Sequence, residues 1–302
     1  MAIPTLDQIG NTPLVRLTQL EEAFALPFEV CAKVELHNPS GSIKDRAAKA
    51  IIEGALARGE ISNSAEIVEA TSGNMGISLA MIASSMHLGC KIYMPMSASM
   101  EREQMMKQYG AEVIRVQGGM KECSEKAQNY CKSHINSYFC DQFNNSDCVL
   151  AHYQTGQEIM DCLGRSPDYF IAGIGTGGTI SGCAGILKNS GNVQIIGVEP
   201  EASPLLTKGM AAPHKIQGIG ANFIPSILKR ELIDKVIDVS DEQAYYYTRT
   251  LKDVAGLFVG ITSGAALAAL MQMKEEIKAG SKVVLILPDN GNRYLSVEGL
   301  YD

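Results

Sequence analysis

Five consecutive residues in the second half of the chain combine glycines with hydroxyl side chains: Gly175, Thr176, Gly177, Gly178 and Thr179. They follow an apolar run that begins at Tyr169 and lead into a run with helical periodicity. Glycine lets backbone N–H groups approach an anion closely, and threonine hydroxyls add further donors. The stretch therefore predicts a loop between a strand and a helix that wraps a single phosphate group.

The same stretch also fits another anion-binding pattern. Gly173, Gly175 and Gly178 have the spacing of a dinucleotide-binding loop, and Glu199 follows where a ribose-binding acid would lie. A dinucleotide loop holds its pyrophosphate mainly by backbone groups at one helix end. It usually comes early in its domain, whereas here two other donor-rich loops precede it. A single phosphate is thus the favoured interpretation, and a nicotinamide-dependent dehydrogenase is the alternative.

The first of those earlier loops, "NPSGSIKDRAA", places a lysine at the start of a helical pattern. Ser42 lies three residues before Asp45, a spacing that predicts a capping box and puts Lys44 in the first helical turn. The partial positive charge of a helix N-terminus disfavours a cation there. A lysine with a depressed pKa acts as a neutral amine nucleophile, whereas the ordinary interpretation is a solvated surface lysine.

The second earlier loop, "EATSGNMGIS", lies between a predicted strand and a predicted helix. Ligands of open α/β sheets bind at such positions. Thr71, Ser72 and Asn74 supply donors, and Gly73 lets backbone N–H groups approach an anion. The loop therefore predicts a carboxylate-binding site, with an ordinary strand-to-helix connection as the alternative.

The elements that must position these loops alternate between strand-like and helix-like runs. Apolar strand patterns such as "AEIVEAT", "KIYMPM" and "KVVLILP" are separated by longer helical patterns, for example "IKDRAAKAIIEGALARG". Alternation of this kind predicts an α/β fold in which parallel sheets are covered by helices.

Composition narrows the class of function. The chain has 302 residues, of which 46% are hydrophobic, and a formal net charge of -7. These values favour a soluble enzyme and argue against nucleic acid or an anionic membrane as partner. The N-terminal stretch lacks the apolar core of a signal peptide, and no apolar run is long enough to span a bilayer. The cysteines are scattered without metal-ligand spacing, so we expect no metal site and a cytoplasmic location.

Taken together, the motifs resemble the cysteine synthase (O-acetylserine sulfhydrylase) family. With the cystathionine β-synthases, this family belongs to the fold-type II enzymes that use pyridoxal phosphate. The resemblance runs from "IGNTPLVRL" to "GNRYLS" and includes "NPSGSIKDR", "TSGNMG", "GIGTGGTISG", "GVEPE", "GIGANFIP" and "GITSGAA". It implies a two-domain fold like that of the tryptophan synthase β subunit, with pyridoxal 5'-phosphate as cofactor. It also implies one phosphate rather than two, and a structural role for Glu199.

The resemblance assigns roles to individual residues. Lys44 matches the lysine that forms a Schiff base with the cofactor, and Asn74 matches the asparagine that hydrogen-bonds its ring oxygen. Thr262 stands where the family places a hydroxyl near the pyridine nitrogen, with Ser263 as the less favoured choice. The cofactor phosphate is assigned to Gly175, Thr176, Gly177, Gly178 and Thr179. The substrate carboxylate is assigned to Thr71, Ser72, Gly73, Met75 and Gln142.

The implied reaction follows from the hydroxyl near the ring nitrogen. A neutral hydroxyl does not hold that nitrogen protonated as a carboxylate would, so the ring is a weaker electron sink. Such a ring suits β-elimination followed by nucleophilic addition, with Lys44 as general base at the α-carbon. The favoured function is replacement of the acetate of O-acetylserine by sulfide, which gives L-cysteine.

Other functions share the same motifs. The related chemistries are lanthionine or cystathionine synthesis, reaction with an amine nucleophile, and desulfhydration of cysteine with release of sulfide. An alternative from a different class is a regulatory module that binds the C-terminal tail of serine acetyltransferase. The sequence does not rank O-acetylserine, O-phosphoserine, serine and cysteine as donors.

The family fold also implies a domain division. Residues 41–143 would form a small, mobile, substrate-binding domain, and residues 1–40 with 144–302 would form the large cofactor-anchoring domain, usually in a homodimer. Three features depart from the family pattern. Met75 stands where threonine is common, Thr262 stands where serine is common, and the tail is shorter than in many cysteine synthases. Met75 either shapes the pocket for a larger partner or packs against the mobile domain.

Overall fold

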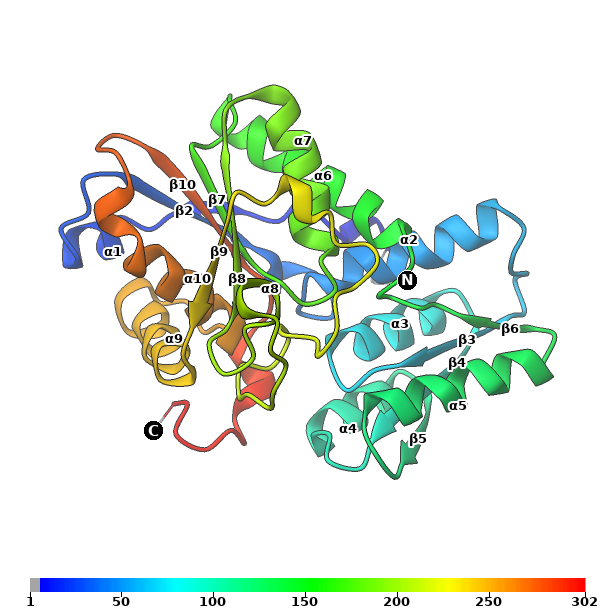
Figure 1. Ribbon diagram of the computed structural model, residues 1–302. Helices are drawn as coiled ribbons and strands as arrows, with labels where there is room; N and C mark the ends of the chain where they lie inside the picture. The colour runs from blue at the N-terminus through cyan, green and yellow to red at the C-terminus, as the bar shows by residue number, and fades with distance from the viewer. Residues whose placement is uncertain (1–5, 302) are drawn as a thin grey trace.

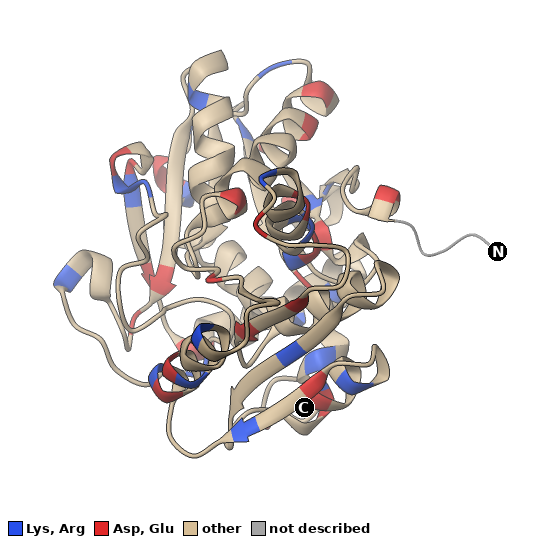
Figure 2. Ribbon diagram, turned by 90° about the vertical axis from the view of Figure 1, so that its right-hand side faces the viewer, with Lys and Arg blue, Asp and Glu red and all other residues tan. Residues whose placement is uncertain are grey.

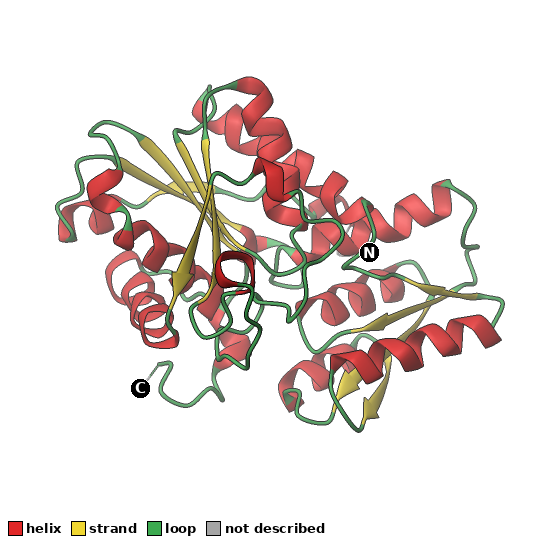
Figure 3. Cartoon of the chain, in the orientation of Figure 1, coloured by secondary structure: helices red, strands yellow, loops and turns green. Residues whose placement is uncertain are grey.

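The computed structural model describes residues 6–301 and confirms the predicted α/β fold. Two sheets lie side by side, and the four-stranded sheet is on the right in Figure 1, with α3 (Asn74–Ser85), α4 (Met100–Gln108) and α5 (Met120–Ser133). Helices flank both sheets, as the colouring of Figure 3 shows. In the view of Figure 2, basic and acidic residues are interspersed over the helices. The interspersed charges agree with the small net charge of the chain.

The larger sheet has six strands in the order β1-β2-β10-β7-β8-β9. All neighbours pair in parallel except β1 and β2, which are antiparallel. In sheet order the strands are β1 (Leu14–Arg16), β2 (Glu29–Val34), β10 (Lys282–Leu287), β7 (Tyr169–Gly173), β8 (Gln194–Pro200) and β9 (Lys235–Val239). The sheet thus joins the first strands of the chain to its second half.

The smaller sheet has four strands in the order β5-β4-β3-β6, all of them parallel. In sheet order the strands are β5 (Glu112–Val116), β4 (Gly89–Pro95), β3 (Glu66–Ala70) and β6 (Ser137–Phe139). These bounds lie inside the segment predicted as a small domain. The domain boundaries and the mobility of that segment stay predictions.

Helices connect the strands as the alternating pattern predicted. The α-helices are α1 (Thr18–Ala23), α2 (Lys44–Ala57), α3 (Asn74–Ser85), α4 (Met100–Gln108), α5 (Met120–Ser133), α6 (Asp147–Leu163), α7 (Gly178–Ser190), α8 (Leu205–Lys208), α9 (Asp241–Ala255) and α10 (Ile261–Gln272). No helix within residues 6–301 combines the length and the apolar character that a bilayer span requires. Within the same range, no group of three or more His, Cys, Asp or Glu side chains is placed to hold a metal ion.

Alternation along the central strands explains why both faces of the larger sheet are covered. On β10, Val283 and Leu285 pack in the apolar cluster that contains α10, whereas Val284 and Ile286 pack in the cluster that contains α7. Successive side chains of a strand point to opposite faces, so a strand with apolar residues at every position is buried on both sides. This covering leaves the carboxyl ends of the parallel strands as the place where polar loops meet.

Candidate active site

Lys44 is the first residue of α2, and no carboxylate among the described residues lies within ion-pair distance of its amine. Burial lowers the pKa of Lys44 because it disfavours the charged ammonium, while neighbouring Cys148 and Asp289 oppose that shift. Burial also raises the pKa of the Cys148 thiol to about 12, so this thiol is neutral near pH 7. A lysine that is partly buried, unpaired and depressed in pKa can act as a nucleophile or a base.

The capping box predicted for Ser42 and Asp45 is wrong. Helix α2 begins at Lys44 without a side-chain cap, and the Ser42 hydroxyl accepts from the Lys44 backbone N–H at 3.3 Å. The Asp45 carboxylate instead accepts from the Ser40 backbone N–H at 2.7 Å and from the Ser78 hydroxyl at 2.6 Å. Ser78 belongs to α3. A donor from a distant helix has therefore replaced the local capping contact.

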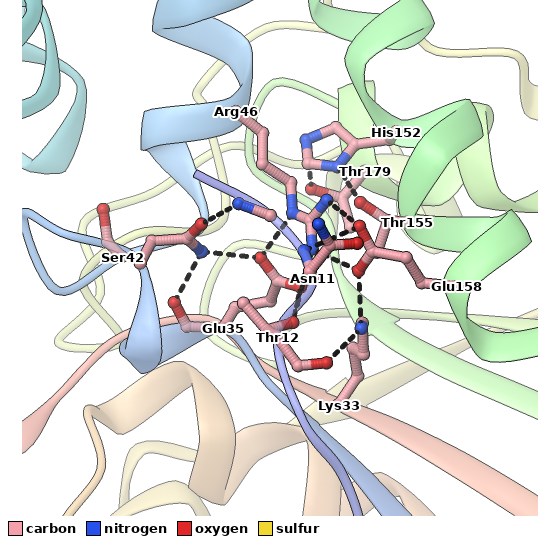
Figure 4. Close-up of polar contacts among 12 residues, drawn as sticks. Asn11, Thr12, Lys33, Glu35, Ser42, Arg46, His152, Thr155, Glu158 and Thr179 are labelled. Atoms are coloured by element: carbon pink, nitrogen blue, oxygen red, sulfur yellow. Dashed lines mark hydrogen bonds and ion pairs between the residues drawn. The ribbon is translucent and has the colours of Figure 1, made fainter. Parts of the chain in front are cut away.

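Arg46 lies within a buried network that connects α2 to β2 and α6 (Figure 4). Its guanidinium donates to Glu35 at 2.7 Å and to Glu158 at 2.6 Å. Lys33 pairs with Glu158 at 2.6 Å and donates to the Thr12 carbonyl at 2.6 Å. Burial alone would raise the pKa of Glu158, but hydrogen bonds and charge from Arg46, with Lys33, outweigh it and lower that pKa to about 2. The network holds the segment that carries Lys44.

The predicted phosphate loop lies at the start of α7. Helix α7 begins at Gly178, and the residue before it, Gly177, has φ +84° and contributes no side-chain cap. The hydroxyl of Thr176 accepts from the Gly178 N–H at 3.3 Å, and the hydroxyl of Thr179 lies 3.2 Å from Nε2 of the buried His152. Burial, with the positive charge of Arg46, lowers the pKa of His152 far below its usual value, so its imidazole is neutral. The uncapped N–H groups of a helix this long suit an anion.

Close packing explains the glycines of this loop. A β-carbon on Gly175 would lie 2.5 Å from the Gly218 carbonyl oxygen, and one on Gly177 would lie 2.8 Å from the Leu228 side chain. Neither position admits a side chain without moving the neighbouring segment. The backbone of the loop is therefore held against residues 218 and 228 while its amide groups remain at the helix start.

The dinucleotide alternative loses two of its four supporting residues. A β-carbon on Gly173 would lie 2.7 Å from the Thr262 methyl group, so this glycine serves packing. The Glu199 carboxylate accepts from the backbone N–H groups of Leu206 and Thr207, both at 2.8 Å, and from the Thr207 hydroxyl at 2.7 Å. Glu199 thus holds the start of α8, in line with the structural role that the resemblance implied.

The predicted carboxylate loop lies at the start of α3. Gly73 donates its N–H to the Thr71 hydroxyl at 3.2 Å, and Arg102 from α4 donates to the Ser72 carbonyl at 3.3 Å. Helix α3 begins at residue 74 without a side-chain cap, which leaves N–H groups at its start. The Met75 side chain is 1% exposed and belongs to the apolar cluster of the smaller sheet, which favours packing over a role in the pocket.

Gln142 is buried beside the same loop. Its backbone N–H donates to the Glu69 carboxylate at 3.2 Å, and the N–H of Ala70 donates to the same group at 2.8 Å. Burial raises the pKa of Glu69 to about 8 despite these bonds. Glu69 is the next-to-last residue of β3, just before the carboxylate loop, so it links the loop to the segment that carries Gln142.

Asn74 is held by two side chains from the far end of the sequence. Its amide nitrogen donates to the Asp289 carboxylate at 2.6 Å, and its amide oxygen accepts from Arg293 at 2.6 Å. Tyr294 donates to the same Asp289 oxygen at 2.5 Å. Sequence reasoning missed Asp289 and Arg293 as site residues, and the only signal was their position within the "GNRYLS" end of the resemblance.

Thr262 lies in the first turn of α10, where its hydroxyl donates to the Gln217 carbonyl at 3.0 Å. The hydroxyl of Ser263 is buried and has no hydrogen-bond partner within residues 6–301. The N–H of Gly260, just before α10, donates to the Asp289 carbonyl at 3.0 Å. The Thr262 helix therefore starts beside the residue that holds Asn74.

These contacts bring the predicted segments together. Ser42 forms a β-bridge with Asp289, so the Lys44 loop, the Asn74 loop and the start of α10 all meet at Asp289. A β-carbon on Gly178 would lie 3.0 Å from the Cys148 carbonyl, so the phosphate loop packs on α6 next to a neighbour of Lys44. Within residues 6–301, no hydrogen bond joins Gln142 to the phosphate loop.

Comparison with known proteins supports one family for the whole chain. The family model described as pyridoxal-phosphate dependent enzyme matches residues 5–289. The cysteine synthase B of Campylobacter jejuni is 46% identical over 296 residues, which cover 96% of this chain and 96% of that protein.

Two solved structures are similar over nearly their full lengths. A hydrogen sulfide-producing enzyme from Fusobacterium nucleatum is 41% identical, with a TM-score of 0.92, and the match covers 98% of this chain and 100% of that one. An O-acetylserine dependent cystathionine β-synthase from Helicobacter pylori is 38% identical, with a TM-score of 0.93 and full coverage of both chains.

Proposed function

From the premise that this chain belongs to the pyridoxal-phosphate dependent enzymes, in the cysteine synthase group, we propose that it makes L-cysteine from O-acetylserine and sulfide. The observation that carries the proposal is Lys44. Its amine is partly buried, has no ion-pair partner among the described residues and has a lowered pKa. It begins the helix at the point where the loops predicted to bind a phosphate and a carboxylate come together.

The residues present fit pyridoxal phosphate. The start of α7 offers uncapped N–H groups, glycines that admit no β-carbon and two threonine hydroxyls, which are the donors that a phosphate monoester needs. Asn74 bonds the Asp289 carboxylate and the start of the Thr262 helix bonds the Asp289 carbonyl, so amide and hydroxyl groups come from two segments that meet next to the Lys44 loop. These residues would hold the phosphate, the ring oxygen and the ring nitrogen respectively.

When bound, pyridoxal phosphate supplies an electron sink for the bonds at the substrate α-carbon. The side chain of Lys44 would hold the cofactor, and its Nζ, as a neutral amine, would accept the α-proton. The uncapped start of α3, with the hydroxyls of Thr71 and Ser72, binds the substrate carboxylate and so orients the α-carbon toward that amine. Gln142 reaches the same carboxylate from the segment held by Glu69.

A matrix of donors and nucleophiles tests the proposed reaction. The purified holoenzyme is incubated with O-acetylserine, O-phosphoserine, serine or cysteine, each with sulfide, cysteine or homocysteine, and the products are identified by mass spectrometry. We expect the highest kcat/KM for O-acetylserine with sulfide. No cysteine above the enzyme-free reaction, with rapid sulfide release from cysteine instead, would overturn this assignment.

A second candidate is release of sulfide from cysteine. The observation in its favour is the 41% identity over the full length of the hydrogen sulfide-producing enzyme from Fusobacterium nucleatum. The similar cystathionine β-synthase from Helicobacter pylori likewise supports a thiol amino acid as nucleophile. The same matrix separates these reactions by their products. The proposed reaction forms cysteine, the second candidate releases sulfide from cysteine, and a thiol amino acid as nucleophile gives a thioether.

Three further properties belong to the proposal. We expect a homodimer in the cytoplasm, a mobile segment 41–143 and, in the regulatory alternative, binding of the serine acetyltransferase tail near the substrate loop. Light scattering gives the mass of the assembly in solution. A peptide with the acetyltransferase C-terminal sequence should compete with O-acetylserine if the regulatory alternative holds.

A further inference from the structure

Asn74, Asp289 and Arg293 form a contact between the two sheets. Asn74 begins the helix that packs on the smaller sheet, whereas Asp289 and Arg293 follow the last strand of the larger sheet. The amide nitrogen of Asn74 lies 2.6 Å from Asp289 Oδ2, and its amide oxygen lies 2.6 Å from Arg293 Nη1. Both partners are buried, with Asp289 2% exposed and Arg293 4% exposed.

The chemistry of these partners allows only one orientation of the amide. A guanidinium has donors and no acceptor, and an ionised carboxylate has acceptors and no donor. Turning the Asn74 amide over would place its NH₂ against the guanidinium and its oxygen against the carboxylate, which breaks both hydrogen bonds. Because the amide nitrogen carries two hydrogens and donates one of them to Asp289, a second N–H remains for another acceptor.

Asp289 is itself held in place. Tyr294 donates to its Oδ2 at 2.5 Å, and its backbone pairs with Ser42 and accepts from Gly260. A β-carbon on Gly260 would lie 2.1 Å from Asp289 Oδ1, so only glycine admits the carboxylate there. The neighbouring Pro288 carbonyl accepts from the Ile43 N–H at 2.8 Å, which ties this loop to the residue before Lys44.

We infer that Asp289 and Arg293 are positioning residues that fix the Asn74 amide, so that its second N–H is donated to the ring oxygen of the cofactor. The inference rests on the proposed function, because it takes Asn74 as the cofactor contact. The inference adds the reason why the NH₂ group of Asn74, and not its oxygen, faces the cofactor. It also explains a buried carboxylate that has no ion pair among the described residues and lies beside the reactive lysine.

A double-mutant cycle in the full-length protein tests this inference. The apoenzymes of Asn74→Ala, Asp289→Ser and the double variant are titrated with pyridoxal phosphate, and the dissociation constant and visible absorption spectrum are recorded. A serine hydroxyl both donates and accepts, so Asp289→Ser removes the acceptor-only partner of the amide nitrogen and leaves Arg293 as the one side chain that still favours the native orientation. We expect each single variant to bind pyridoxal phosphate about tenfold more weakly and the double variant to bind no more weakly than Asn74→Ala.

Two further variants make the test decisive. Arg293→Met removes the partner on the oxygen side of the amide, and combining it with Asn74→Ala should weaken binding no further than Asn74→Ala alone. This variant tests the inference even if Asp289→Ser does not fold. Glu199→Gln is the matched control: Glu199 is also 2% exposed and accepts backbone N–H groups, but it has no contact with Asn74. Glu199→Gln should change the dissociation constant of pyridoxal phosphate only slightly, and by the same factor in the unmodified protein and in Asn74→Ala.

The outcomes separate the inference from the function beneath it. If Asp289→Ser and Arg293→Met weaken binding equally with and without the Asn74 amide, they act on the fold alone and the inference is overturned while the proposed function stands. If Asn74→Ala binds pyridoxal phosphate like the unmodified protein, the cofactor contact assigned to Asn74 is wrong, and the inference falls with it.

Discussion

Two clusters of buried charge lie close to the segment that carries Lys44, and they are built differently. The cluster around Arg46 pairs its charges: Arg46 bonds Glu35 and Glu158, and Lys33 bonds Glu158. The cluster around Asp289 contains buried polar atoms that have no partner within residues 6–301. They are Asp289 Oδ1, Asn290 Oδ1, Arg293 Nε and, on the neighbouring α4, Arg102 Nε.

Because only the first cluster pairs its charges, the pKa values of Arg46 and Arg293 shift in opposite directions. Burial alone would lower the pKa of Arg46, but Glu35 and Glu158 outweigh it and raise that pKa. Burial dominates at Arg293 and lowers its pKa, although Asp289 opposes the shift. A paired buried cluster stabilises one arrangement of the chain, whereas unpaired buried polar atoms cost free energy and mark places where a ligand adds contacts. The first cluster thus supports the fold, and the second belongs to the site.

The largest expected effect is at Lys44, which is two residues from Arg46 in sequence and is influenced by the charge of Asp289. Lys44→Ala should reduce turnover by about 10³-fold or more, because it removes the residue that we propose as both nucleophile and base. The unfolding midpoint should change little, since Lys44 makes no ion pair among the described residues. The measurements are steady-state kinetics, urea unfolding and reduction with borohydride. A lysine adduct of pyridoxal phosphate that persists in the variant would contradict the assignment.

Breaking the paired cluster should instead lower stability. Arg46→Met leaves Glu35 without its main partner and should lower the free energy of unfolding by about 3–5 kcal/mol. Arg165→Met is the control, because Arg165 pairs with Asp168 at 2.8 Å but is 46% exposed, and it should cost at most about 1 kcal/mol. Urea titration of the three proteins measures both effects. Equal decreases in the free energy of unfolding of the two variants would show that the buried Arg46 network stabilises the protein no more than an exposed ion pair does.

The phosphate loop should respond in cofactor affinity rather than stability. Replacing Thr176 and Thr179 together by valine removes two hydroxyl donors while keeping the side-chain shape. Each hydrogen bond to a charged group contributes about 1.5–3 kcal/mol, so loss of both should weaken binding of pyridoxal phosphate by about a hundredfold to ten-thousandfold. Titration of the apoenzyme measures this affinity. An unchanged dissociation constant would exclude these hydroxyls from the phosphate site.

Acid should weaken the paired cluster in a defined pH range. The pKa of Glu158 falls from 4.5 to about 2 in the folded protein, so its contribution is fully present above pH 4.5 and is lost as pH falls toward 2. The glutamine of Glu158→Gln does not ionise, so the free energy of unfolding of this variant should depend less on pH between pH 4.5 and pH 2. Urea unfolding at intervals from pH 6 to pH 3 tests the difference. Parallel curves for the two proteins would show that other carboxylates control acid unfolding.

The smallest effect on selectivity is expected at Met75. Its side chain is 1% exposed in the apolar cluster of the smaller sheet, so Met75→Thr should change the ratio of kcat/KM values between donors by no more than about twofold. It should lower stability by about 1–3 kcal/mol, because a hydroxyl replaces a buried thioether. A large shift toward O-acetylserine and sulfide would restore the interpretation that Met75 shapes the substrate pocket.

Local patterns in the sequence determined the fold class and the main loops of the site. The alternation of strand-like and helix-like runs predicted parallel sheets covered by helices, and β10 is buried on both faces. The glycine and threonine run at 175–179 predicted an anion loop at a helix start, and α7 begins within it. These signals are contained in short segments, because strand periodicity, helix starts and backbone freedom depend on neighbouring residues.

Only the tertiary structure decided which side chains hold these loops. Asp289 reaches Asn74 from 215 residues away, and Glu158 reaches Arg46 from 112 residues away. The capping box predicted from Ser42 and Asp45 was lost in the same way, because Ser78 from another helix bonds Asp45. No local spacing encodes such contacts, since they depend on how the two sheets and their helices pack. A buried carboxylate accepts hydrogen bonds from the donors that packing brings close to it. Removing one of those donors leaves a buried polar group unpaired, which costs free energy of folding.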